Sequence, residues 1–431
     1  MTSSASKSAL SLVAAALACL LVLAGGTLIT ATGACAQIQF GPTDGWGETS
    51  DVDPAVERQA LKEFERNPEA GLPTLSPANV EATKKAIKRY TDIVAAGGWL
   101  AVPDDVVKPG ESSPAVAALR ARLAVSGELS DAGSGEALQG DVFDALKAYQ
   151  TTNGLTPNGR IDKPTIAALN VPAQDRLKQL KTNLTRLGEL TGVVKAQRKY
   201  VIVNIPAAQV EAVALNRVVS RYTGVVGKVD RPTPLLRSTI TEMNFNPIWR
   251  LPPTVIQKDL IPQGRRMQAE GKNVLIKTGI EAYDGNGKKV DPEKIDWNSS
   301  QPQSFAYRQP PGKENPLGFV KINFASGESV YMHDSPSEGL FGRNFRAASS
   351  GCIRVHNVEK LANWLLAQND GWDEDRVAKI KESGQRLDVR LATPVALHFV
   401  YITAWATEDG VIQFRRDLYN RDGVSEIATS Y

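Results

Sequence analysis

The sequence predicts a multidomain α+β protein in which a small helical unit precedes a β-rich domain. Between residues 78 and 196 apolar residues recur at helical spacing. From about residue 197 onward, short runs rich in Val, Ile, Tyr and Phe are bounded by Gly, Pro or Asp. The chain has 431 residues, 42% hydrophobic and 23% charged, which is enough for two or three such domains. The net charge of +3 is spread along the chain, and no basic tract indicates nucleic acid binding.

The first 36 residues have the pattern of a secretory signal peptide. Lys7 precedes an apolar stretch over residues 9–23, and small residues follow up to Ala36, after which we expect cleavage. A retained membrane anchor is the alternative, because apolar character continues weakly through residues 28–29, and the signal segment would then be the part that contacts the membrane. The pattern predicts export. Residues 37–77, rich in Gly, Pro, Asp and Glu, predict a flexible tether.

Cysteine usage singles out one residue. Signal cleavage would remove Cys19 and Cys35 and leave Cys352 alone, in a compartment where cysteines usually form disulfide pairs. An inert, buried thiol is the plainer interpretation. However, an unpaired exported thiol risks mispairing and oxidation, so its presence favours catalysis.

The helical region covers residues 78–171. Within it, residues 113–170 predict three short helices, with a glycine-flanked turn, Gly154 to Gly159, before the third. A leucine stripe over residues 172–196 predicts a linker helix that packs on a neighbouring domain. The β-rich domain then covers residues 197–406, and residues 407–431 are expected to form a C-terminal tail. Residues 251–304 lack the pattern of short apolar strands. So long an insertion in a β-rich domain is expected to be a functional lid.

Two residues of the β-rich domain carry the candidate chemistry. A cysteine thiol needs a base or a positive environment to become a nucleophile, and His333, at the end of a strand pattern, can supply the base. Cys352 follows the small-residue turn Ser349-Ser350-Gly351, whose backbone N–H groups could form an oxyanion hole. Arg354 could hold a substrate carboxylate or pair with an internal one.

The other histidines are weaker candidates. His356 lies four residues after Cys352 but is expected near the N-terminus of a helix, where a cation is unfavourable. His398 lies in an apolar strand pattern and is expected to be a hydrogen-bonded core residue. Three scattered histidines without paired-ligand spacing argue against a catalytic metal, and no cofactor is indicated.

These residues resemble the signature of a known family. His333, a spacer of 15 residues and then Ser349-Ser350-Gly351-Cys352-Ile353-Arg354 are similar to the motif of L,D-transpeptidases with a YkuD-type catalytic domain, although most members have histidine where this chain has Ser350. The stretch from Phe245 to Pro262 resembles the larger periplasmic members. Residues 113–170 resemble the small peptidoglycan-binding domain of wall enzymes, with Asn158 where that family more often has Asp.

The resemblance implies a mixed-sheet sandwich for residues 197–406, a periplasmic location, and action on peptidoglycan. It implies that Cys352 attacks a tetrapeptide stem to form a thioester, that His333 acts as general base, and that 3→3 cross-links or other amide links result. It also implies acylation by carbapenems. Further candidates for contact with the stems are Tyr331, Trp249, Phe341 and Arg346. The sequence leaves open a carboxypeptidase or cross-link hydrolase with the same dyad, a non-catalytic wall-binding protein, the acceptor amine and the oligomeric state.

Overall fold

The computed structural model describes residues 55–56, 58–59, 61–62 and 73–430. The expected signal segment, residues 1–36, and most of the expected tether, residues 37–77, lie outside the described residues. Within the described part of the chain, no helix combines the length and the apolar character needed to cross a membrane.

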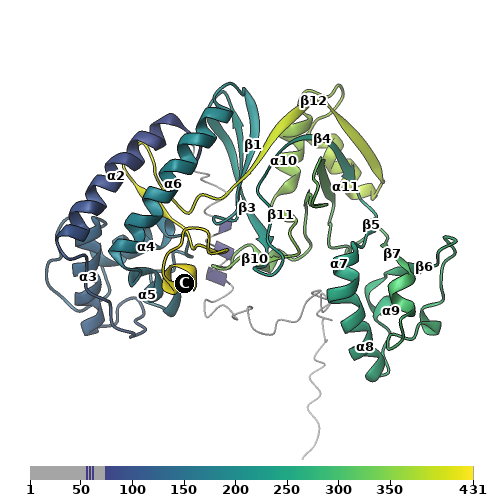
Figure 1. The fold of residues 1–431 in the computed structure, drawn as a ribbon, viewed down its shortest axis with the longest axis horizontal. Helices are drawn as coiled ribbons and strands as arrows, with labels where there is room; N and C mark the ends of the chain where they lie inside the picture. The colour runs from purple at the N-terminus through teal and green to yellow at the C-terminus, as the bar shows by residue number, and fades with distance from the viewer. Residues whose placement is uncertain (1–54, 57, 60, 63–72, 431) are drawn as a thin grey trace, which may run out of the picture. The chain divides into compact units, whose positions relative to one another are not determined.

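The N-terminal part is helical where the sequence predicts it. Helix α2 (Pro77–Ala95) begins at Ser76, whose hydroxyl accepts a hydrogen bond from the Asn79 N–H. The three-helix unit comprises α3 (Pro114–Ser126), α4 (Asp141–Thr152) and α5 (Lys163–Leu169). The linker helix is α6 (Ala173–Val194), which runs alongside α2 (Figure 1).

Glycine allows the close packing expected of the turn between α4 and α5. A Cβ atom on Gly159 would lie 2.2 Å from the ring of Phe143 on α4, and Gly159 has a positive φ of 67°. Both conditions favour glycine at this position. Residues 113–170 therefore form one unit around a common apolar core that includes Leu119, Leu146 and Ile166.

The β-rich domain is built on nine strands. They are β1 (Lys199–Asn204), β2 (Gln209–Ala214), β3 (Arg217–Gly227), β4 (Leu236–Phe245), β8 (Val320–Phe324), β9 (Met332–His333), β10 (Ala347–Ser349), β11 (Ile353–Val355) and β12 (Leu387–Val400). Their order is β10-β3-β11-β9-β8-β4-β12-β1-β2, and a further pairing joins β2 to β3. The strands thus form one mixed sheet that closes on itself, where the resemblance implied a sandwich.

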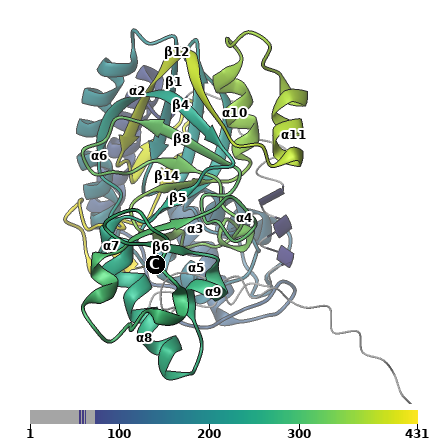
Figure 2. The ribbon, with the colours of Figure 1, turned by 90° about the vertical axis from the view of Figure 1, so that its right-hand side faces the viewer.

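Side chains alternate between the two faces of this sheet. One face packs on α10 (Val358–Leu366) and α11 (Glu374–Ser383), which lie side by side (Figure 2). On β1 this face carries Val201 and Val203, whereas Tyr200 and Ile202 point the other way and pack on Leu187 of α6. Both faces of β1 are therefore buried, which explains its continuous apolar sequence.

The expected excursion at residues 251–304 is a folded insertion that is wider than predicted. It contains β5 (Trp249–Arg250), α7 (Pro253–Val255), the π-helix η1 (Ile256–Leu260), α8 (Ile261–Ala269), α9 (Val274–Thr278), β6 (Glu281–Tyr283), the 3₁₀ helices η2 (Pro292–Lys294) and η3 (Gln301–Ser304), and β7 (Ala306–Gln309). Strands β5, β7 and β6 form a small sheet of their own. The insertion has a separate apolar core, which includes Leu260, Trp297 and Leu317.

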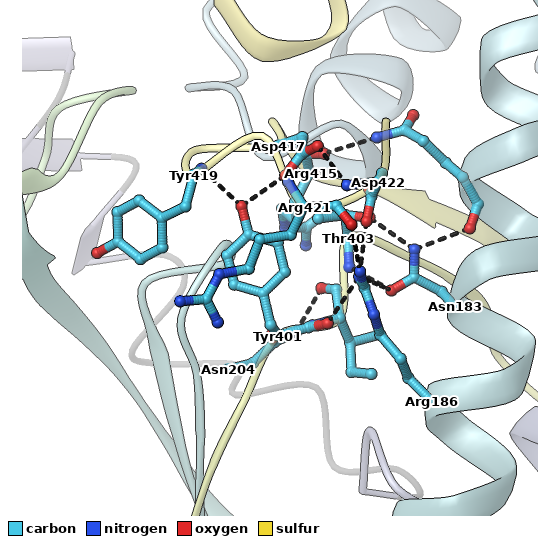
Figure 3. Close-up of polar contacts among 12 residues, drawn as sticks. Asn183, Arg186, Asn204, Tyr401, Thr403, Arg415, Asp417, Tyr419, Arg421 and Asp422 are labelled. Carbon is cyan, nitrogen blue, oxygen red and sulfur yellow. Dashed lines mark hydrogen bonds and ion pairs between the residues drawn. The ribbon is translucent and has the colours of Figure 1, made fainter. Parts of the chain in front are cut away.

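Residues 407–430 do not form the tail that the sequence suggested, because they fold back onto the helices. Strand β13 (Ala404–Ala406) pairs with β14 (Ile412–Phe414), and α12 (Glu426–Ser430) packs against α5. Figure 3 shows the polar contacts that hold this segment. Asp417 accepts a hydrogen bond from Tyr401 at 2.6 Å, and Asp422 forms an ion pair with Arg186 of α6, also at 2.6 Å. Buried polar partners hold this segment, so apolar periodicity did not reveal it.

Candidate active site

Strand pairing brings the predicted dyad to one face of the sheet. Strands β9 and β11 are parallel neighbours, with Met332 opposite Ile353 and His333 opposite Arg354. Because side chains alternate along a strand, His333, Arg354 and Cys352 project from the same face. Cys352 immediately precedes β11, two residues before the partner of His333. The alternate residues Met332 and Ile353 point into the core and anchor both strands.

The backbone of Asp334 and of Pro316 hydrogen bonds to the His333 ring. Its Nδ1 lies 2.5 Å from the carbonyl oxygen of Asp334. Since a carbonyl can only accept, Nδ1 carries the hydrogen and Nε2 keeps a lone pair that can take a proton. The Asp334 carboxylate instead accepts the Phe319 N–H at 2.8 Å, so it is not the group that orients the ring. Burial, and secondly the charge of Arg354, lower the pKa of His333 to about 3.

The Cys352 thiol lies in a positive but shielded environment. The residue is half-buried, and burial raises the pKa of its thiol above the ordinary value. Hydrogen bonds from Tyr331 and the charges of Lys321 and Arg354 act in the opposite direction. Burial dominates, so both the Cys352 thiol and the His333 imidazole are neutral at rest at neutral pH.

The turn before Cys352 is fixed by hydrogen bonds. The Gly351 N–H donates to Ser349 Oγ at 3.1 Å, and Ser349 Oγ donates to the Cys352 carbonyl at 2.6 Å. Gly351 has a φ of +109°, which favours glycine at this position. The Gly351 N–H, one of the groups expected to form the oxyanion hole, is thus engaged by Ser349 in this structure. The Cys352 N–H has no hydrogen-bond partner among the described residues.

A second loop, residues 227–233, forms hydrogen bonds with this turn. Thr233 Oγ1 donates to the Gly351 carbonyl at 2.9 Å. Arg231 Nη1 lies 2.8 Å from Ser350 Oγ and 2.7 Å from Asp259 Oδ2 on η1. Tyr419, from the C-terminal segment, accepts the Thr233 N–H and donates to the Gly227 carbonyl. The turn is thus linked by hydrogen bonds, through residues 227–233, to the insertion and to the C-terminal segment.

Of the four further cleft candidates, the structure brings two to the site. The Trp249 side chain hydrogen bonds to the Tyr331 side chain, which in turn interacts with the Cys352 thiol. Phe341 instead packs on Val225 and on the ring of His356, with ring centroids 4.8 Å apart. Arg346 reaches the carbonyl of Ala207 at 2.9 Å. Phe341 and Arg346 line cavities that do not include Cys352 or His333.

The other two histidines, His356 and His398, make contacts elsewhere, so His333 is the histidine of this site. His356, the alternative base, lies against Phe341, and His398 Nε2 lies 2.8 Å from the side chain of Gln197. His398 is 4% exposed and sits beside Tyr200. In the part of the chain that the structure describes, no group of three or more His, Cys, Asp or Glu side chains is placed to hold a metal ion.

Comparison with known families identifies the β-rich domain. Residues 198–395 match the model of the YkuD family, the L,D-transpeptidase catalytic domain. The match confirms the resemblance predicted from the motif around Cys352.

The chain is also similar to individual proteins. A putative L,D-transpeptidase of Haemophilus influenzae is 33% identical over 223 residues, which cover 52% of this chain and 44% of that protein. The chain therefore spans less than half the length of this relative. Among solved structures, an L,D-transpeptidase from Stackebrandtia nassauensis is 12% identical, with 70% of this chain and 96% of that chain covered and a TM-score of 0.26. An L,D-transpeptidase in complex with imipenem is 14% identical, with 47% and 59% covered and a TM-score of 0.23.

Sequence reasoning missed several residues around the YkuD site. Lys321 lies opposite His333 on β8, with its Nζ 4.5 Å from the centre of the Tyr331 ring. Arg231 lies in the loop of residues 227–233 and Asp259 on η1, both far in sequence from the motif around Cys352. Lys321 could have been found from the alternation of "VKINF", which places a lysine on the polar face of a strand. Nothing in the sequence pairs Arg231 with Asp259.

We expect Arg231→Gln to destabilise the YkuD domain by about 3 kcal/mol, because the variant leaves the Asp259 carboxylate buried without its cation. The two side chains are 12% and 4% exposed, so water cannot replace the lost partner. The measurement is the free energy of unfolding in urea. The double variant Arg231→Gln with Asp259→Asn should recover most of the loss. If the single variant were as stable as the parent, the ion pair would not brace the turn.

Proposed function

We propose that this protein is an L,D-transpeptidase that joins peptidoglycan stems through a thioester on Cys352. The match of residues 198–395 to the model of the YkuD family, the L,D-transpeptidase catalytic domain, supports the general activity. The observation that carries the proposal is that Cys352 directly precedes β11, which pairs with the strand that ends in His333, while Nδ1 of the imidazole lies against the Asp334 carbonyl. A nucleophile beside an oriented base is the arrangement that acyl transfer needs.

The first half-reaction is acylation. Cys352 Sγ attacks the carbonyl that joins the third residue of a tetrapeptide stem to its terminal D-alanine. His333 Nε2 takes the thiol proton and delivers it to the departing D-alanine amine, so a thioester and free D-alanine result. A neutral imidazole suits this step, because a protonated ring could not accept the proton. The low pKa of His333 keeps the ring neutral well below pH 7.

Charge that develops during acylation needs stabilisation from fixed groups. The Cys352 N–H is the candidate donor to the oxyanion, because the Gly351 N–H is bound to Ser349. Lys321 and Arg354 lower the pKa of the Cys352 thiol, so their charges favour the thiolate as it forms. Arg354 also remains a candidate to hold a stem carboxylate.

The second half-reaction transfers the acyl group to an amine. The side-chain amine of an acceptor stem attacks the thioester, His333 takes the amine proton, and the Cys352 thiol is regenerated. The product is a 3→3 cross-link, or another amide if the amine comes from elsewhere. We further propose that the protein is exported to the periplasm, that residues 113–170 bind peptidoglycan, and that carbapenems acylate Cys352.

Product analysis tests this function. The purified mature chain is incubated with tetrapeptide muropeptides, and the products are separated and weighed by mass spectrometry. Dimers that appear together with released D-alanine would support transpeptidation. Tripeptides without dimers would instead indicate a hydrolase with the same dyad. No reaction at all would favour a wall-binding protein without catalysis.

The insertion is proposed to exclude water from the acyl-enzyme through Trp249. We expect Trp249→Phe to raise the share of hydrolysis several-fold relative to transfer, because the phenyl ring keeps the packing but cannot hydrogen bond to Tyr331. The measurement is the ratio of tripeptide to dimer. Trp297→Phe is the matched control, since Trp297 is buried in the same core and stacks on Tyr307. An equal ratio in both variants would contradict the role of Trp249.

A further inference from the structure

A cationic cavity lies where the three-helix unit meets the YkuD domain and the C-terminal segment. Its volume is about 220 Å³. Four of its lining side chains are cations, and among the described residues no Asp or Glu lines it. The four cations are Lys163, Arg346, Arg415 and Arg416. Such an excess of one charge in a concave site favours an anionic ligand.

The walls of this cavity are held together by specific contacts. Asn344 Oδ1 accepts hydrogen bonds from the Thr156 N–H at 2.6 Å and from Thr156 Oγ1 at 2.7 Å. Arg415 Nη1 donates to the Thr152 carbonyl at 2.8 Å. A Cβ atom on Gly154 would lie 2.7 Å from Arg415 Cδ, so glycine lets the arginine cross the turn. The cavity is therefore pre-formed, which lowers the entropic cost of binding.

Arg346 provides the best-placed cation. Its Nη1 and Nη2 donate to the carbonyls of Arg343 and Ala207, at 2.8 and 2.9 Å. These neutral acceptors fix the guanidinium but do not compensate its charge. Its Nε is buried and has no hydrogen-bond partner among the described residues. Burial and the nearby charge of Arg415 lower the pKa of Arg346 to about 10. A bound carboxylate would supply the missing counter-charge and accept from Nε.

An adjoining cavity of about 310 Å³ extends this space. The two cavities share six lining residues, among them Arg346 and Arg415. Glu211 lines the second cavity, but its carboxylate is already engaged by Arg221 at 3.0 Å and by the Thr74 N–H and hydroxyl. The second cavity gives space for the parts of a ligand on either side of its anionic group. Arg346 lines both cavities and can contact that anionic group.

We propose that this junction binds a free carboxylate of a peptide, with Arg346 as its principal partner and Lys163 at the entrance. A tetrapeptide stem ends in the carboxylate of D-alanine. The junction would therefore hold one peptidoglycan stem while Cys352 acts on another. This assignment to a stem rests on the proposed function, whereas carboxylate binding at Arg346 does not.

Calorimetry with the full mature chain carrying Cys352→Ala tests the proposal. The probe is a tetrapeptide stem with free carboxylates, and the comparison ligand is the same peptide with its carboxylates amidated. We expect Arg346→Gln to weaken binding of the free peptide at least about tenfold and Lys163→Gln to weaken it about threefold. Arg346→Lys should retain part of the affinity. Lys181→Gln, an exposed charge on α6 away from the cavity, should leave it unchanged.

Two results would overturn the proposal. They are equal affinity of Arg346→Gln and its parent, and equal affinity for the free and the amidated peptide. Thermal melting reports whether Arg346→Gln is folded. If it is not, Lys163→Gln and the amidated peptide still decide the question, because neither disturbs the Arg346 contacts.

Parallel acylation of the unsubstituted chain by imipenem separates the two proposals. Normal acylation combined with binding that does not depend on Arg346 would reject the carboxylate site and leave the transpeptidase intact. Binding that depends on Arg346, in a chain that neither reacts with imipenem nor forms dimers, would reject the transpeptidase and leave the carboxylate site standing.

Discussion

Replacing Cys352 with Ala is expected to abolish both imipenem adduct formation and dimer synthesis, with a loss of at least about 10³-fold in rate. The reason is that the acyl group is carried on the sulfur, and among the described residues Cys352 is the sole cysteine. Intact-protein mass spectrometry after exposure to imipenem measures the adduct directly. Chromatography of muropeptide products measures the cross-linking.

Two controls accompany the Cys352 prediction. Cys352→Ser keeps the shape of the side chain but is a far weaker nucleophile, so its adduct should also be absent or very slow to form. Ser350→Ala leaves the thiol in place and removes the hydroxyl that contacts Arg231, so it should still be acylated. A stoichiometric adduct on Cys352→Ala would show that another group reacts and would remove the basis of the proposed mechanism.

The central pair of the site could be predicted from the sequence because each residue marks an end of local structure. His333 ends a strand, and Cys352 follows a turn of small residues, so both lie where a sheet can bring side chains together. The parallel pairing of β9 with β11 then sets their relation. The pairing itself was not predictable, since two-residue and three-residue strands carry too little periodicity to fix a register.

Other parts of the site depend on contacts between segments that are distant in the chain. The Arg231–Asp259 ion pair and the Tyr419 contacts to residues 227–233 join loops, helices and the C-terminal segment. Polar side chains in loops have no periodic signal, so sequence patterns indicate neither the partners nor the geometry. The hydrogen bond of the Gly351 N–H could not be predicted for a related reason. A nearby serine hydroxyl competes for it, and only the folded turn shows that Ser349 reaches it.

The fold was predictable where apolar periodicity is strong. Helices α2 to α6 have leucine and alanine stripes, and Pro or capping residues mark several of their starts. Residues 407–431 lack such a stripe, and buried carboxylates such as Asp417 and Asp422 hold them in place. The closure of the sheet through β2 and β3 is also a long-range property. Alternation predicts strands but not how many neighbours each one has.

Replacing His333 with Gln is expected to slow acylation by imipenem about 10²- to 10⁴-fold, because the thiol loses the group that takes its proton. In the parent, the pKa of His333 is about 3 and burial raises the pKa of Cys352. The reacting thiol and neutral imidazole therefore persist from mildly acidic to mildly alkaline pH. The rate of acylation in the parent should be level between pH 5 and 8, without the inflection near pH 6.5 of an ordinary histidine.

The same variant makes a prediction about stability. Since the pKa of His333 falls from 6.5 in the unfolded chain to about 3 in the folded protein, the unfolded chain binds a proton between these values and the folded protein does not. The parent therefore loses stability as the pH falls below 6.5, by about 2 kcal/mol between pH 7 and 5 from this group alone. His333→Gln should lack that part of the loss. The measurement is the difference in unfolding free energy between parent and variant at the two pH values.

The two readouts together distinguish a base from a structural residue. A histidine that merely fills space would give the stability difference but little change in acylation after correction for folded protein. His398→Gln is the matched control, because burial also lowers the pKa of His398 but its ring contacts Gln197 and Tyr200, away from Cys352. It should alter the dependence of stability on pH and leave acylation unchanged. If His398→Gln slowed acylation as much as His333→Gln, the assignment of His333 as the base would fail.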